Sequence, residues 1–343
     1  MIITSIDMTK TRNLGLDLIR ITACLLVILY HIPQNVETQW VFHDIVSRGL
    51  NSILFYFGRC AVPMFFIMSG FLLLPTESPM AVFYRKRLLR IALPTAFWFA
   101  IYYFFGKSYD NPNYCFWIAK TPHLWYMYAL IGVYLIIPIV SPWYKKSSTK
   151  EKSFFLALWG VSLLLTFVNN YNPIRIEFTH VGQLYYTPFH SLLYVSGYIG
   201  YFFLGAMIRD NQEWIGKHRL LICIVCSVLY VAINIIGKIT GASSANLDAY
   251  LSLPTCLLSI MMFVVLLEFG KYLNNKNLKW GVIRLADSTF SIYLMHVLVL
   301  ENLRFESLGG YSRIFLGIAV FLLCFLLYSL ITSIIPKSKY VLG

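Results

Sequence analysis

Long apolar segments, separated by short polar ones, run along almost the whole chain. Ten of them are about the length that a helix needs to cross the ~30 Å hydrocarbon core of a bilayer. They cover residues 14–33, 50–74, 88–106, 123–142, 153–170, 190–208, 219–238, 250–270, 287–303 and 312–335. The pattern predicts an all-α fold, a polytopic membrane protein with about ten transmembrane helices. We expect residues 1–343 to form a single membrane domain without a fused soluble domain.

Composition supports the membrane class. Hydrophobic residues make up 58% of the 343 residues and charged residues only 13%, whereas soluble domains average about 25% charged residues. The seven cysteines are scattered, mostly inside apolar segments. This distribution predicts neither a disulfide framework nor a metal site.

The net charge of +13 follows from the loops. Nineteen Lys and Arg residues fall on the side of the two termini, and eight, including Arg59 and Arg313, fall on the other side. By the positive-inside rule both termini are predicted to be cytoplasmic. Since the basic residues sit in short loops beside membrane lipids, the charge indicates topology and does not indicate nucleic-acid binding.

The first apolar segment contains Asp17, Arg20 and His31. On a helix Asp17 and Arg20 are neighbours, while Arg20 and His31 face within about 20° of each other and lie about 16 Å apart along the axis. Charged groups are costly in lipid. The spacing therefore predicts a polar stripe from the inner surface to the outer end. The alternative is that Arg20 and His31 reach to the two interfaces and anchor the helix.

Two further segments carry candidate site residues. Tyr293 and His296 share one helix face and are predicted either to line a site or to pack in the core. We expect His31, near the outer end, and His296, at mid-span, to stand apart from each other. The fourth segment begins at the outer surface with side chains that suit either an aromatic belt or a platform for a sugar ring: His123, Trp125 and Tyr126.

The inner surface carries basic residues after the second segment. Arg87 and Arg90 project together, and Arg85 lies nearby. Guanidinium groups match phosphate oxygens, although a positive anchor beside anionic lipid is the simpler interpretation. Ser69 and Gly70 end the second segment and suit either ligand binding or close helix packing.

The inner arginines and the histidine of the first segment together suggest a transfer reaction. An inner arginine cluster suits an anionic donor, and a histidine, whose pKa lies near neutrality, suits a general base acting on a hydroxyl. An acyl thioester of coenzyme A fits the donor, because its phosphates would stay on the arginines while its long arm reaches towards His31.

Five short motifs carry a resemblance to a known family. Along the chain they are Arg20 and His31 with ten residues between them, Ser69-Gly70-Phe71, Arg87-Leu88-Leu89-Arg90, "HLWY" from 123 and "SIYLMH" ending at 296. In this order the sequence resembles the membrane acyltransferase-3 family, and it is similar to members that O-acetylate enterobacterial common antigen and O-antigens. The resemblance implies a multi-pass protein of the bacterial inner membrane.

The resemblance also implies roles. His31 would be the catalytic base or, as the alternative, a transient acyl carrier. Arg20, Arg87 and Arg90 would bind or orient the donor, and His296 and Tyr293 would line the site. Acetyl-CoA would be a substrate, with no permanently bound cofactor, and the acceptor would be a hydroxyl of a surface-glycan, lipid-linked sugar. Spacing alone suggests that Asp17 pairs with Arg20.

Three other classes stay open. A secondary transporter of a glycan-related or anionic small molecule also suits buried charge, although neither repeated halves nor correspondingly broken helices are visible. A haem or quinone protein would use His31 and His296, but their expected separation argues against it. The third is a sensor or assembly partner without catalysis.

Overall fold

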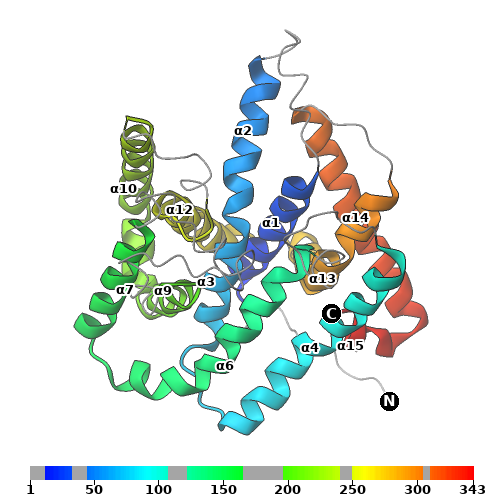
Figure 1. Cartoon of the computed structure of the whole chain (residues 1–343), viewed down its shortest axis with the longest axis horizontal. Helices are drawn as coiled ribbons and strands as arrows, with labels where there is room; N and C mark the ends of the chain where they lie inside the picture. The colour runs from blue at the N-terminus through cyan, green and yellow to red at the C-terminus, as the bar shows by residue number, and fades with distance from the viewer. Residues whose placement is uncertain (1–11, 33–44, 107–121, 165–195, 240–248, 304–309) are drawn as a thin grey trace, which may run out of the picture.

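The computed structural model describes residues 12–32, 45–106, 122–164, 196–239, 249–303 and 310–343, and every regular element in these ranges is helical (Figure 1). Within them, eight helices are long and apolar enough to cross a membrane. The chain is therefore an all-helical, multi-pass membrane protein. The predicted spans 153–170 and 190–208 fall partly outside the described residues. Their described parts belong to α7 (Thr149–Leu164) and α9 (Ile199–Asp210). The count of ten stays a prediction.

The other predicted spans correspond to helices of the structure. They are α1 (Leu14–His31), α2 (Ile45–Arg59) with α3 (Ala61–Leu73), α4 (Met80–Phe105), α6 (Trp125–Lys146), α10 (Gln212–Ile239), α12 (Leu253–Phe269), α13 (Lys276–Asn302) and α14 (Gly310–Ile334). Short helices flank some of them: η2 (Pro122–Leu124), η5 (Gly270–Tyr272), η6 (Pro336–Ser338) and α15 (Lys339–Leu342).

Two of these helices begin well before the predicted boundary. α4 begins at Met80 and α13 at Lys276, so basic segments that the sequence suggested were loops are helical. Arg and Lys are good helix formers, so each helix continues through them towards its N-terminus as far as a residue that fixes the start of a helix. These residues are Pro79 before α4 and Asn275, whose side chain accepts hydrogen bonds from the backbone at the start of α13.

One apolar stretch, residues 49–73, is interrupted between α2 and α3. Pro63 has no backbone N–H, so the Arg59 carbonyl four residues earlier has no intrahelical partner and the helix breaks there. α2 and α3 nevertheless follow one another along one course (Figure 1). Arg59, predicted from the sequence to lie on the outer side, thus lies inside this stretch.

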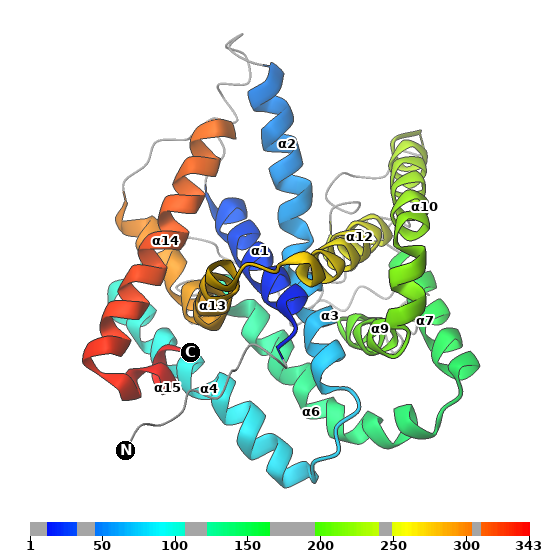
Figure 2. The same cartoon turned by 180° about the vertical axis from the view of Figure 1, so that it is seen from behind.

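α1 occupies the middle of the described molecule. It contacts α2, α3, α12, α13 and α14, and it lies between them in both views (Figures 1 and 2). Its apolar side chains, such as Ile19, Ala23 and Ile28, are fully buried. Because most of α1 is covered by protein, its polar groups meet other helices.

α3 and α9 cross at close range through two glycines. A Cβ on Gly205 would lie 1.9 Å from the Ile67 carbonyl oxygen, and one on Gly70 would lie 2.1 Å from that of Phe202. Contacts this short are possible only without a side chain. The geometry supports the packing interpretation of Gly70.

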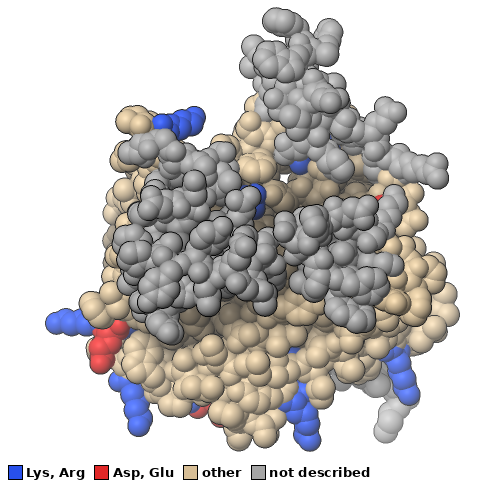
Figure 3. All heavy atoms as spheres, in the orientation of Figure 1, with Lys and Arg blue, Asp and Glu red and all other residues tan. Residues whose placement is uncertain are grey.

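Charged side chains gather at one rim. Most Lys and Arg side chains visible in Figure 3 lie along its lower edge, where α4 begins and α6 ends, and the described surface directly above that edge is mainly tan. An apolar band bordered by basic residues is what a bilayer requires. Which side is cytoplasmic stays a prediction.

Candidate active site

Three histidines meet at the end of α1. The ring centroid of His31, the last residue of α1, lies 5.0 Å from that of His296 in α13 and 6.5 Å from that of His123 in η2. His123 and His296 are 5.7 Å apart and both are buried. The expectation that His31 and His296 stand apart is therefore wrong. Within the described residues, no group of three or more His, Cys, Asp or Glu side chains is arranged to hold a metal ion.

The register of α1 against α13 explains this meeting. The Cys24 thiol donates to the Thr289 carbonyl at 3.4 Å. Seven residues separate Cys24 from His31, and seven separate Thr289 from His296. The two helices run in the same direction at this contact, and seven residues are about two helical turns. The contact between Cys24 and Thr289 therefore places His31 beside His296 two turns further along.

Hydrogen bonding assigns the proton positions in the cluster. The Val27 and Tyr293 carbonyls can only accept, so they take the Nδ1–H of His31 (2.8 Å) and of His296 respectively. In neutral rings both Nε2 atoms then carry no proton. His296 Nε2 lies 3.3 Å from His31 Nδ1 and accepts part of the same N–H. His31 Nε2 is therefore free to accept a proton from a substrate.

A cavity opens beside His31, and more than a third of the His31 surface is accessible there. Aromatic side chains dominate its wall, among them Trp125 and Tyr126 of the predicted sugar platform. The complete lining is Val27, Tyr30, His31, Gly58, Val62, His123, Trp125, Tyr126, Tyr250 and Tyr293. The aromatic faces are of the kind on which the C–H surface of a sugar ring stacks. The space between them is small, about 20 Å³, so a sugar ring would enter only after the aromatic side chains move apart.

His123 lies differently from the sequence expectation. It is only 4% exposed and contacts Tyr102, with ring centroids 4.6 Å apart, instead of lying at an outer interface. The Tyr293 hydroxyl donates to its carbonyl and so ties η2 to α13. Within the described residues neither ring nitrogen of His123 makes a hydrogen bond. A buried polar group without a partner is one that a ligand can satisfy.

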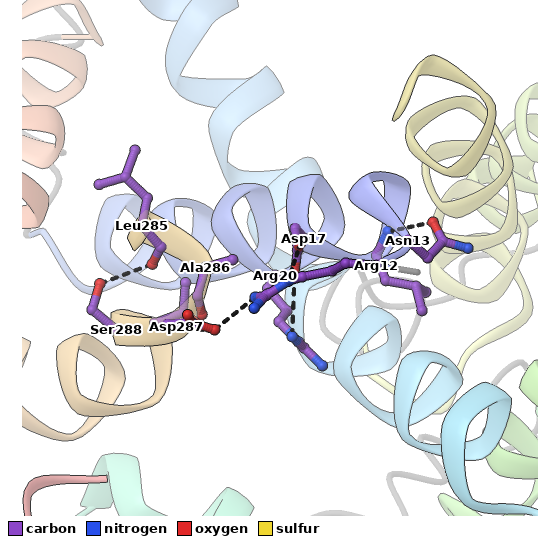
Figure 4. Close-up of polar contacts among 10 residues, drawn as sticks. Arg12, Asn13, Asp17, Arg20, Leu285, Ala286, Asp287 and Ser288 are labelled. Carbon is purple, nitrogen blue, oxygen red and sulfur yellow. Dashed lines mark hydrogen bonds and ion pairs between the residues drawn. The ribbon is translucent and has the colours of Figure 1, made fainter. Parts of the chain in front are cut away.

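The other end of α1 holds a network of ions (Figure 4). Asp17, 1% exposed, accepts from Arg12 Nε at 2.7 Å and from Arg20 at 3.2 Å. Arg12 also reaches Asp287 of α13 at 2.6 Å. The predicted Asp17–Arg20 pair is present, but Arg12 is the closer partner. The hydrogen bond to Asp17 raises the pKa of Arg12 above its usual value.

Sequence reasoning missed two members of this network. Arg12 is one of the nineteen basic residues on the side of the termini, and Asp287 is the first residue of the predicted span 287–303; neither was predicted to belong to the site. The available signal was weak: an acid at the inner end of one span and a base just before another. Nothing in either segment's own periodicity says that the two helices are neighbours.

Four of the predicted donor-binding residues lie in the neighbourhood of Tyr134. Arg20, Arg87 and Arg90 all lie within electrostatic range of its hydroxyl, and the Ser69 side chain contacts it. Arg87 and Arg90 are exposed, and the described residues give them no ion pair. Arg85 is exposed in the same helix, but nothing places it beside Tyr134. Tyr134 itself was not predicted.

Fold and site together define a class: a multi-pass helical membrane protein with a cluster of two buried histidines and one accessible histidine at one end of a central helix, and arginines near the other end. A sequence profile of the acyltransferase-3 family, described as an acyltransferase domain, matches residues 13–335. The chain belongs to this family, which confirms the resemblance drawn from the five motifs.

The relatives found among curated proteins are polysaccharide-related. A Staphylococcus aureus (strain MSSA476) protein named "Probable poly-beta-1,6-N-acetyl-D-glucosamine export protein" is 26% identical over 324 residues, covering 89% of this chain and 86% of its own. A Staphylococcus epidermidis protein of the same name is 26% identical over 159 residues, covering 45% and 40%. No solved structure gives a significant match.

Proposed function

We propose that this protein is an O-acyltransferase that moves an acetyl group from cytoplasmic acetyl-CoA to a hydroxyl of a surface-glycan sugar carried on lipid, with His31 as the general base. The observation that supports this proposal is the place of His31: it lines an aromatic cavity, and the Val27 carbonyl holds its Nδ1, which leaves Nε2 as the nitrogen available to a substrate. Towards the opposite end of the same helix, Arg20 pairs with Asp17, while Arg87 and Arg90 of α4 form no ion pair among the described residues.

The donor would bind from the inner side. Arg20, Arg87 and Arg90 offer guanidinium groups to the phosphates of coenzyme A. Arg20 and His31 are about 16 Å apart along α1. The slender arm of the donor would follow this helix and carry the thioester to the cavity.

The reaction needs one proton transfer in each direction. His31 Nε2 takes the proton of the sugar hydroxyl, and the oxygen attacks the thioester carbonyl. The carbon–sulfur bond then breaks, and the coenzyme A thiolate leaves with the proton returned from His31. His296 Nε2, as acceptor for His31 Nδ1–H, holds the ring in orientation and stabilises its charged form.

The first acceptor to test is suggested by the relatives. They are named for poly-beta-1,6-N-acetyl-D-glucosamine, so oligosaccharides of this polymer are the natural starting probe. O-antigen sugars are the second.

Substitution of His31 tests the proposal directly. We expect His31→Ala to reduce acetyl transfer at least about 100-fold, the usual contribution of a general base. The measurement is the mass gain of the glycan together with coenzyme A release, in purified protein reconstituted in nanodiscs. His218→Ala, in α10 and bonded only to the Trp214 carbonyl among the described residues, is the matched control. A stable His31→Ala variant with full activity would contradict the assignment of His31 as the general base.

A second candidate is glycan export, because the relatives are named export proteins. An exporter would move oligosaccharide across a vesicle membrane without consuming thioester. An acyltransferase would release one coenzyme A for each acetyl group gained by the glycan. Measuring both quantities in the same vesicles separates the two activities.

A further inference from the structure

Arg59 is a charged residue near the middle of a membrane-spanning stretch. It ends α2, at the interruption within residues 49–73 that Pro63 imposes. An ionisable residue at this depth is costly in lipid and usually has a functional reason. Its half-buried side chain enters the protein interior instead of the lipid.

Three aromatic rings surround this guanidinium. Arg59 Cζ lies 4.8 Å from the ring centroid of Tyr30 and 5.2 Å from those of Phe55 and Tyr250. Stacking on rings stabilises the cation through the planar faces of the guanidinium. The N–H donors of a guanidinium lie in its plane, in the fork geometry that binds an oxyanion.

The described residues supply no acid to Arg59. It forms no ion pair with them, and its buried Nε has no hydrogen-bond partner among them. Arg313 makes a useful contrast: it is fully buried, but it donates to the Asn51 side chain at 2.8 Å and to the Leu29 carbonyl at 2.7 Å. Arg313 thus has two hydrogen bonds to the protein, although its Nε, like that of Arg59, has no partner among the described residues. Arg59 has its charge against aromatic rings and is the cation that remains for a ligand.

The aromatic cage of Arg59 is also a wall of the His31 cavity. Tyr30 and Tyr250 line that cavity, and the Tyr30 ring centroid lies 5.9 Å from that of His31. Gly58 lets the Tyr30 ring approach α2, since a Cβ there would lie 3.0 Å from it. Tyr30 therefore contacts both the base and the cation, so one substrate can reach both.

We propose that Arg59 binds an oxyanion of the acceptor, a phosphate or a carboxylate, beside the hydroxyl that His31 deprotonates. The assignment to the acceptor rests on the proposed function: the donor would occupy the arginines at the other end of α1, so the cation at this end faces the second substrate. The acceptor is then an anionic saccharide. Its charge is either the phosphate that joins a sugar to lipid or the carboxylate of an acidic sugar.

Binding of three soluble probes tests this site without any reaction. The probes are N-acetylglucosamine, N-acetylglucosamine 1-phosphate and glucuronic acid. Each is titrated onto protein reconstituted in nanodiscs, and binding is followed by tryptophan fluorescence, because Trp125 lines the cavity. We expect the unsubstituted protein to bind one anionic probe about 10- to 100-fold more tightly than the neutral sugar, the usual gain from hydrogen bonds to a charged group. Preference for the phosphate or for the carboxylate identifies the source of the charge.

The variants decide whether Arg59 is responsible. Arg59→Gln is expected to lose the anion preference while it still binds the neutral sugar, and Arg59→Lys to keep only part of the preference. Arg284→Gln removes another arginine that stacks on an aromatic ring, Trp280, and should leave the preference intact. If Arg59→Gln fails to fold, a preference in Arg59→Lys equal to that of the unsubstituted protein overturns the proposal. Equal affinity of the unsubstituted protein for neutral and anionic probes overturns it too.

Acetyl transfer is measured separately. Absence of transfer to every acceptor would contradict the proposed function, whereas an anion preference lost in Arg59→Gln would still establish the site. Transfer with an unchanged KM for the anionic acceptor in Arg59→Gln would contradict the site alone.

Discussion

At the residue scale, the inner end of α1 depends on a single buried carboxylate. Asp17 is surrounded by Arg12 and Arg20, and Arg12 extends the network to Asp287 on α13. A buried charge is tolerated only while its partners stay in place. Arg12 therefore serves two purposes: it neutralises Asp17 and it fastens the start of α1 to α13.

Removing this arginine should destabilise the protein. In Arg12→Met, Asp17 keeps only the longer contact with Arg20, and we expect a loss of about 1–3 kcal/mol, the cost of leaving a buried acceptor underpaired. Thermal unfolding in detergent micelles measures it. Arg85→Met, which removes an exposed arginine outside the network, should change stability by less than about 0.5 kcal/mol. Equal unfolding temperatures for the two variants would contradict the role given to Arg12.

The site was predictable where residues lie on one helix. Helical spacing placed Asp17, Arg20 and His31 on one stripe, and the structure agrees with the Asp17–Arg20 pair that follows from it. The histidine cluster was not predictable, because it depends on which helices are neighbours. His31 and His296 are 265 residues apart in sequence, and no periodicity within either segment records their contact.

At the element scale, the crossing of α3 and α9 depends on the absence of two side chains. Gly205→Ala would place a methyl group against the Ile67 carbonyl. We expect the helices to separate, with a loss of about 1–3 kcal/mol or more. Gly132→Ala, on an exposed helix face with nothing within 4 Å, should be neutral or gain about 0.5–1 kcal/mol. Unfolding curves of the two variants in the same detergent provide the comparison, and a Gly205→Ala variant as stable as Gly132→Ala would contradict the close crossing.

Helices were easier to predict than their ends. Hydropathy located the cores of α1, α12 and α14 closely, because lipid requires a minimum apolar length. It missed the first turns of α4 and α13, because basic residues lower the mean hydropathy of a segment yet are favourable for a helix. The interruption at Arg59 was missed as well, although Pro63 in the sequence is its physical cause.

At the scale of the whole molecule, the distribution of Lys and Arg predicts the orientation in the membrane. Alkaline phosphatase, which is active only outside the cytoplasm, should be inactive when fused after Ser148 or after Gly343 and active when fused after Lys238. Green fluorescent protein at the same sites should give the opposite pattern and controls for expression. Phosphatase activity after Gly343 would show that the chain is inserted the other way round.

The central position of α1 has a consequence for biogenesis. α1 leaves the ribosome before the other helices described here, yet Cys24 and His31 find their partners on α13, 265 residues later. At about 5–20 residues per second, synthesis of that stretch lasts roughly 10–50 s. During this time a segment with an acid, an arginine and a histidine waits beside the translocon without its neighbours. The first helix to be made is thus among the last to be completed, and quality control in the cell has its longest opportunity to reject the chain at that segment.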